Sequence, residues 1–159
     1  EEVKALVSAA KFPPVGNRGY CPNRTTVWGA DEWSKDVFSY MEECNRRVKL
    51  LPQCETAEAL ACIEEIVAID GVDGVFVGPC DLSISLGIPL QFDNPKLTDA
   101  IEHVIDACHK AGKECVIFAG SVQDAKKWLS KGADSVAYSL DAAQLTNAVK
   151  SAVGEIKAL

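Results

Sequence analysis

The segment GVFVGPCDLSISLG, residues 74–87, decides how this sequence folds. Its first four residues have the length and apolar character of a buried β-strand. Gly78 and Pro79 then turn the chain, and Asp81 opens a short apolar segment that reads as a helix ending at Gly87. A carboxylate at this point either caps the helix or binds a ligand at the edge of the sheet. A second carboxylate at a matching place would favour the ligand.

Apolar strands alternate with helices along the rest of the chain. We expect strands near residues 48–54, 74–78, 114–118 and 134–138. We expect helices at residues 1–10, 31–46 with Asp31 as cap, 57–68 with Thr56 as cap, 81–87, 94–112, 121–132 and 141–159. Continuously apolar strands that alternate with helices predict an α/β fold with a parallel sheet covered on both faces.

Two architectures fit this order, an open doubly wound sheet and part of a (β/α)8 barrel. A complete barrel needs about 250 residues, whereas this chain has 159 residues and four predicted strands. The chain also begins inside a helix, with no strand before it. This indicates that a segment upstream has been lost, and both architectures stay open at this point.

Composition excludes several classes of protein. The hydrophobic share is 48%, the charged share is 25% and the net charge is −7. These values are typical of one globular domain and argue against a nucleic-acid-binding protein, which needs a basic face. No apolar run approaches the roughly 20 residues that cross a membrane.

The cysteines indicate a reducing, cytoplasmic setting. There are seven, an odd number, and no two form a Cys-x-x-Cys pair. This pattern disfavours a disulfide framework or a zinc site. We expect Cys54, Cys62, Cys108 and Cys115 to be reduced and mostly buried, because they stand in apolar patterns.

Polar side chains and turn residues follow the first two predicted strands. The residues at these strand ends are Gln53, Glu55, Gly78, Pro79, Cys80 and Asp81. Ligands bind at the carboxyl ends of parallel strands in both candidate architectures. The carboxylates of Glu55 and Asp81 on adjacent strands would suit a hard cation such as Mg²⁺ or Mn²⁺. The alternatives are that Asp81 is only a helix cap and Glu55 only a surface residue.

Several motifs resemble those of one known family. They are KFPPVGNRG (11–19), LLPQCET (50–56), IVAIDGVDGVFVGPCDLSISLGIP (66–89) and NPKLTDAIEHVIDACHKAGKECVIFA (94–119). In this order they resemble the HpcH/HpaI family of class II pyruvate aldolases over nearly the whole chain. The resemblance implies a (β/α)8 barrel, usually hexameric, of which residues 1–159 would form a single C-terminal half-barrel with strands five to eight.

The resemblance also implies a reaction and a set of site residues. The family cleaves 4-hydroxy-2-oxo acids to pyruvate and an aldehyde with a divalent cation, Mg²⁺ or Mn²⁺, with Co²⁺ as a further candidate. Glu55 and Asp81 would be the metal ligands, and Gln53 would lie beside them. The backbone at Gly78, Pro79, Cys80 and Asp81 would hold the pyruvate unit, with Cys80 lining the site rather than acting as a nucleophile.

No catalytic acid or base can be assigned in this chain. The resemblance places the histidine and the arginine that act on the substrate in the first half of the barrel. His103 and His109 lie on the predicted helix 94–112, far from the strand ends, and we expect them to be solvated.

Two other functions stay open. One is an acyl-CoA lyase of the citramalyl-CoA or malyl-CoA type, and the other is a non-catalytic half-barrel that associates with itself. A homo-oligomer is expected in either case, because a lone half-barrel exposes two open sheet edges.

Overall fold

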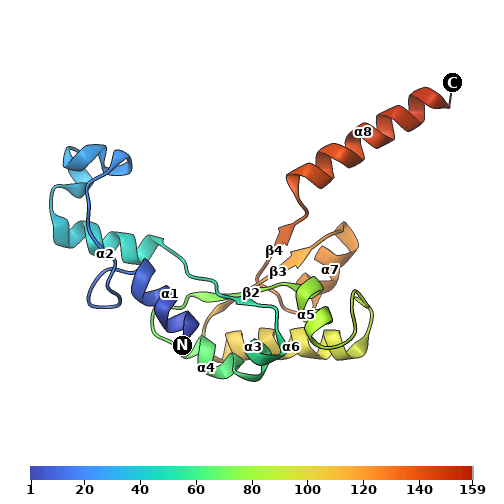
Figure 1. Cartoon of the computed structure of the whole chain (residues 1–159), viewed down its shortest axis with the longest axis horizontal. Coiled ribbons are helices and arrows are strands. Elements are labelled where there is room, and N and C mark those ends of the chain that lie inside the picture. The colour runs from blue at the N-terminus through green and yellow to red at the C-terminus, as the bar shows by residue number, and fades with distance from the viewer. Residues whose placement is uncertain (159) are drawn as a thin grey trace.

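The computed structural model describes residues 1–158, apart from the side chains of residues 25 and 27 (Figure 1). Its elements, in chain order, are α1 (Glu2–Ala10), η1 (Arg24–Gly29), η2 (Glu32–Ser34), α2 (Val37–Arg47), β1 (Gln53–Cys54), α3 (Ala57–Ala61), α4 (Ile63–Val67), β2 (Gly74–Val77), α5 (Pro79–Ser85), α6 (Pro95–Lys110), β3 (Glu114–Ala119), α7 (Val122–Ser130), β4 (Ser135–Tyr138) and α8 (Asp141–Lys157). None of the helices in this described part is both long and apolar enough to cross a membrane.

The four strands form one parallel sheet in the order β1-β2-β3-β4. This confirms the predicted strands and the predicted parallel α/β fold. β1 is shorter than expected for two reasons. Pro52 has no N–H to donate, and the N–H of Leu50 donates to the Asp73 carboxylate instead of to a strand carbonyl (2.8 Å). All four strands run in one direction, so their carboxyl ends lie along one edge.

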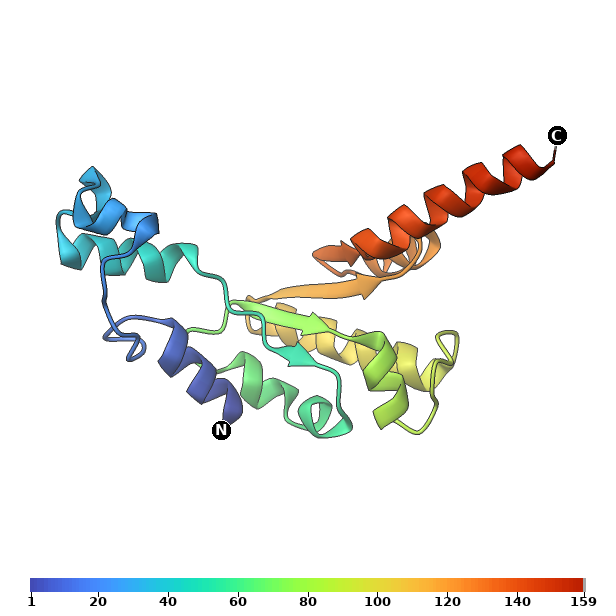
Figure 2. The ribbon, with the colours of Figure 1, turned by 45° about the horizontal axis from the view of Figure 1, so that its top comes forward.

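Burial differs between the two faces of the sheet. Along β3, residues alternate between fully buried and half-buried, with Cys115, Ile117 and Ala119 on the buried face. That face packs on α6, which runs along the sheet (Figure 2). The predicted cover on both faces is therefore found on one face only. The opposite face, with Phe76, is only half-buried, as suits the inner face of a barrel segment.

Two aspartates hold the amino-terminal edge of the sheet in the same way. Asp73 precedes β2 and accepts from the N–H of Leu50, and Asp134 precedes β4 and accepts from the N–H of Cys115, each at 2.8 Å. Each carboxylate thus joins the start of its own strand to the strand before it. The hydrogen bond from Cys115 and the nearby His109 ring lower the pKa of Asp134. The stretches GVDGVFVG and GADSVAYS carry this repeated device.

A buried lysine fastens the same edge. Lys11 is 3% exposed, and its ammonium donates to the backbone carbonyls of Asn45 and Val48 and to the Asp73 carboxylate. These three bonds fill the three donors of the ammonium group. They tie the end of α1 to the segment that leads into β1.

The helix limits differ from the predictions at two places. The predicted helix 31–46 begins later, because Asp36 rather than Asp31 accepts the capping bond, from the N–H of Ser39 (3.0 Å). The predicted helix 57–68 is broken at Cys62 into α3 and α4. The Thr56 cap is confirmed by its bond from the N–H of Ala59 (3.1 Å).

The break also explains a wrong prediction about burial. Cys54, Cys108 and Cys115 are buried as expected, but Cys62 is exposed. Its φ of −112° and ψ of 17° are not helical, so the side chain does not follow the apolar side of one continuous helix. All seven cysteines are free thiols.

The last helix, α8, extends away from the sheet (Figures 1 and 2). None of its residues is buried. The helix was predicted to extend to residue 159, which lies outside the described residues. Its large apolar side chains are exposed, by 69% at Leu145, 54% at Val149, 43% at Val153 and 67% at Ile156. Their spacing of four, four and three residues places them along one side of the helix.

Candidate functional site

The predicted residues of β1 and β2 meet at the carboxyl edge of the sheet. Gln53 and Glu55 alternate with the buried Cys54, so their side chains point to the same face. Both approach Gly78. A Cβ atom placed there would lie 3.0 Å from Glu55 Oε2 and 3.2 Å from Gln53 Nε2. The structure thus brings Gln53, Glu55 and Gly78 together, as the sequence predicts.

Asp81 belongs to the first turn of α5. Gly78 precedes this helix, Pro79 is its first residue and Asp81 its third. The alternative that Asp81 caps the helix is therefore wrong, because the cap position belongs to Gly78. Asp81 is exposed and lies beyond the carboxyl end of β2, as Glu55 lies beyond that of the neighbouring β1.

Neither carboxylate is neutralised by the protein. Among the described residues, no Lys, Arg or His forms an ion pair with Glu55 or Asp81, and no side chain or backbone N–H hydrogen-bonds their carboxyl groups. Ion pairs elsewhere involve other acids, such as Glu43 with Arg46 and Arg47. Two carboxylates at the carboxyl edge of the sheet that have no cationic partner in the described residues can bind an external cation.

The donor set fits a hard divalent cation and does not fit a site built by the protein alone. Within residues 1–158 there is no group of three or more His, Cys, Asp or Glu side chains that could hold a metal ion. Two carboxylates leave coordination positions for water and for oxygen atoms of a substrate, which Mg²⁺ and Mn²⁺ accept. Glu55 and Asp81 would supply the protein ligands.

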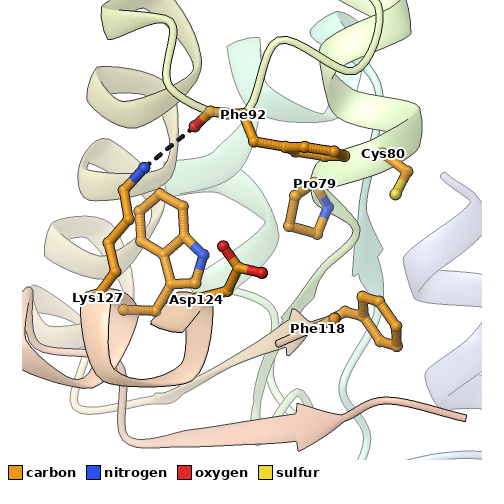
Figure 3. Close-up of a pocket in the computed structure, with 8 residues that line it drawn as sticks. Pro79, Cys80, Phe92, Phe118, Asp124 and Lys127 are labelled. Atoms are coloured by element: carbon orange, nitrogen blue, oxygen red, sulfur yellow. Dashed lines mark hydrogen bonds between the residues drawn. The ribbon is translucent and has the colours of Figure 1, made fainter. Parts of the chain in front are cut away.

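A cavity of about 110 Å³ is lined in part by Pro79 and Cys80, which stand between Gly78 and Asp81 in the chain. Pro79, Phe92 and Phe118 line it from different segments (Figure 3), and Trp128 is a further lining residue. The sequence predicted Pro79 and Cys80 as site residues, but it did not predict the cavity. Its other walls come from the loop before α6, the end of β3 and helix α7, and no local pattern links these segments.

The two histidines lie outside the site, as predicted. His103 pairs with Glu64 on the outer side of α6 and α4, and His109 pairs with Asp134 at the opposite edge of the sheet, both at 3.2 Å. Both side chains are more than two-fifths exposed. They are solvated helix residues and cannot reach a ligand at Glu55 and Asp81.

Comparisons with known proteins agree on one family. Residues 1–148 match the sequence model described as HpcH/HpaI aldolase/citrate lyase. The chain is 37% identical to a hydroxypyruvate/pyruvate aldolase from Rhizorhabdus wittichii, over 99% of this chain and 61% of that protein. It is 38% identical to a 2-keto-3-deoxy-L-rhamnonate aldolase from Klebsiella pneumoniae, over 94% of this chain and 54% of that protein.

Solved structures show the same likeness. The crystal structure of an HpcH/HpaI aldolase from Desulfitobacterium hafniense superposes with a TM-score of 0.87 at 30% identity, over 98% of this chain and 59% of that one. A family protein from Burkholderia cenocepacia gives 0.86 at 30% identity, over 98% and 60%. The chain therefore spans between half and two thirds of the length of these proteins.

Proposed function

The chain belongs to the HpcH/HpaI aldolase/citrate lyase family, and from this premise we propose that its carboxyl-edge site serves the metal-dependent cleavage of 4-hydroxy-2-oxo acids to pyruvate and an aldehyde. The observation that carries the proposal is the meeting of Gln53 and Glu55 at Gly78, one turn from Asp81, without a protein cation to neutralise the two carboxylates.

The proposed reaction breaks the bond between C3 and C4. The 4-hydroxyl group loses its proton, C4 becomes the aldehyde carbonyl, and the electron pair of the bond stays on C3 as the enolate of pyruvate. C3 then takes a proton. A divalent cation, when bound, supplies Lewis-acid stabilisation of the negative charge that develops on the 2-oxo group.

The residues of this chain would bind and orient the pyruvate unit. Glu55 and Asp81 would hold the cation, and the amide of Gln53 would lie beside it. The N–H groups of Cys80 and Asp81 are free for the substrate carboxylate, since the first backbone bond of α5 runs from Leu82 to Gly78 (3.0 Å). We propose Gly78, Pro79, Cys80 and Asp81 as the segment that receives it.

The proton-transfer groups would come from other residues of the barrel. Residues 1–159 correspond in our proposal to its C-terminal half, and the site described here contains no histidine. The acyl-CoA lyase alternative is the weaker proposal, because both named relatives above are aldolases. Self-association and a cytoplasmic location also belong to the proposal, and the exposed apolar side of α8 supports the first.

Calorimetry with Mn²⁺ and pyruvate tests the site. The unsubstituted chain is expected to bind the pair, and Glu55→Gln and Asp81→Asn are expected to abolish binding, since each removes one of two anionic ligands. Asp106→Asn is the matched control, because Asp106 is an exposed carboxylate on α6 away from the site. Binding that survives in both site variants would overturn the proposal.

A further inference from the structure

The cavity beside Cys80 has a defined shape. Its volume is about 110 Å³, which corresponds to about three to four groups the size of a water molecule. Pro79 and Cys80 form the end next to the proposed pyruvate segment, and the rings of Phe92, Phe118 and Trp128 form much of the rest (Figure 3). Such walls suit a short carbon chain.

The aromatic wall is held in place. Lys127 of α7 donates to the carbonyl of Phe92 (3.1 Å) and lies 3.7 Å from the carboxylate of Asp93. These contacts fix the loop between α5 and α6 over the cavity. Because the Lys127 ammonium contacts the loop at Phe92 and Asp93, it is directed toward the loop and not toward a ligand in the cavity (Figure 3).

One charged group does face the cavity. The carboxylate of Asp124 points into the cavity toward Pro79 (Figure 3). Its Oδ2 accepts from the hydroxyl of Ser121 (2.6 Å), while its Oδ1 has no hydrogen-bond donor within residues 1–158. A ligand end here meets apolar rings and one negative oxygen, so a hydroxyl or methyl end is favoured over an anionic end.

We propose that this cavity receives the carbon chain beyond C3 of a bound 2-oxo acid and selects short, uncharged chains. The inference rests on the proposed function. The carboxylate and keto oxygens of the pyruvate unit are engaged at the metal and the backbone, so any longer acid must extend from C3. The cavity that opens at Pro79 and Cys80 is the adjoining space of suitable size.

Calorimetry of 2-oxo acids in the presence of Mn²⁺ tests the proposal. Burying one CH₂ group favours binding by about fourfold. We therefore expect 2-oxobutanoate to bind about fourfold more tightly than pyruvate and 2-oxopentanoate more tightly still. 2-Oxoglutarate, which has the length of 2-oxopentanoate but a terminal carboxylate, should bind at least about tenfold more weakly than 2-oxopentanoate. Asp124→Asn should reduce this discrimination against the anion.

A variant that fills the cavity sharpens the test. Gly120 lines the cavity, and a Cβ atom there would meet only Phe118 at 3.9 Å, an ordinary contact. Gly120→Val should lower the preference for 2-oxopentanoate over pyruvate to about one. Gly19→Val is the matched control, because a Cβ at this exposed glycine meets nothing within 4 Å.

The outcomes separate this inference from the function on which it rests. If pyruvate shows no Mn²⁺-dependent binding, both the proposed function and the role of the cavity are refuted. If pyruvate binds but affinity does not rise with chain length, or Gly120→Val keeps the preference, the cavity is not the chain site and the proposed function stands.

Discussion

At the scale of single residues, Gly78 shows why the site needs a particular side chain. Its φ of −100° is open to any residue, so backbone freedom is not the reason for glycine here. The reason is space: a Cβ atom would lie 3.0 Å from Glu55 Oε2 and 3.2 Å from Gln53 Nε2, so both side chains would have to move by a few tenths of an ångström. A larger residue would push apart the two side chains that the proposed cation site requires.

Asp134 makes stability depend on pH. The hydrogen bond from Cys115 N–H, and then the His109 ring, lower the pKa of this carboxyl group. A lowered folded pKa means that the contribution is present above the unfolded pKa of about 3.9 and is lost as pH falls through the folded pKa. We expect Asp134→Ala to lower the free energy of unfolding by about 1–2 kcal/mol at pH 7, since the group is partly exposed.

Urea unfolding at pH 7 and at pH 3 measures this effect. The difference between Asp134→Ala and the unsubstituted chain should shrink at the lower pH. Asp106→Ala, at an exposed carboxylate without a partner among the described residues, should change little at either pH. A difference for Asp134→Ala that is equal at both pH values would contradict the account.

The cysteines should fall into two groups by reactivity. Burial is the largest factor that raises the pKa of Cys54, to about 11, and the hydrogen bond that Cys115 donates to Cys108 raises the pKa of Cys115. A thiol titration of the native protein at pH 8 should modify Cys21 and Cys62, which are exposed, and spare these two buried thiols until urea is added. Peptide mapping identifies the labelled residues. Immediate labelling of Cys115 in the native protein would show that the core opens.

At the scale of elements, α8 presents an exposed apolar surface that a binding partner could bury. The helix has 17 residues, none of them buried, and exposed apolar surface of this kind is typical of an interface. We expect Leu145→Lys combined with Val149→Lys to lower the mass measured by sedimentation, because charge on that side prevents association.

The control for α8 lies on a different side of the same helix. Asn147→Lys combined with Ser151→Lys adds the same charge at exposed polar positions and should leave the mass unchanged. An unsubstituted chain that is already monomeric would rule out association through α8.

At the scale of the whole molecule, the proposed site offers the carboxylates of Glu55 and Asp81 to a cation, and we assign no acid or base to it among the described residues. We expect the 159-residue chain to bind Mn²⁺ with pyruvate weakly and to release pyruvate from a 4-hydroxy-2-oxo acid at a rate near background. Loss of a positioned acid or base lowers rates by about 10²–10⁴-fold. A coupled assay for pyruvate measures turnover, with metal-free buffer as the control. Robust metal-dependent turnover would show that a residue of this chain moves the proton.

The sequence by itself determined the order of strands and helices, the parallel sheet and the carboxylates at its edge. These depend on neighbours in the chain: apolar runs make buried strands, and Thr56 and Asn94 cap helices through bonds to residues two or three positions on. Glu55 and Asp81 were predicted for the same reason, since Glu55 directly follows β1 and Asp81 comes four residues after the end of β2.

Only the tertiary structure decided what depends on contacts between distant segments. The break at Cys62, the later start of α2 and the uneven burial of the sheet arise from packing that no local period encodes. The cavity is the clearest case. Its walls join Pro79, Phe92, Phe118 and Trp128, and side chains so far apart in the chain meet only when the sheet and its helices have packed.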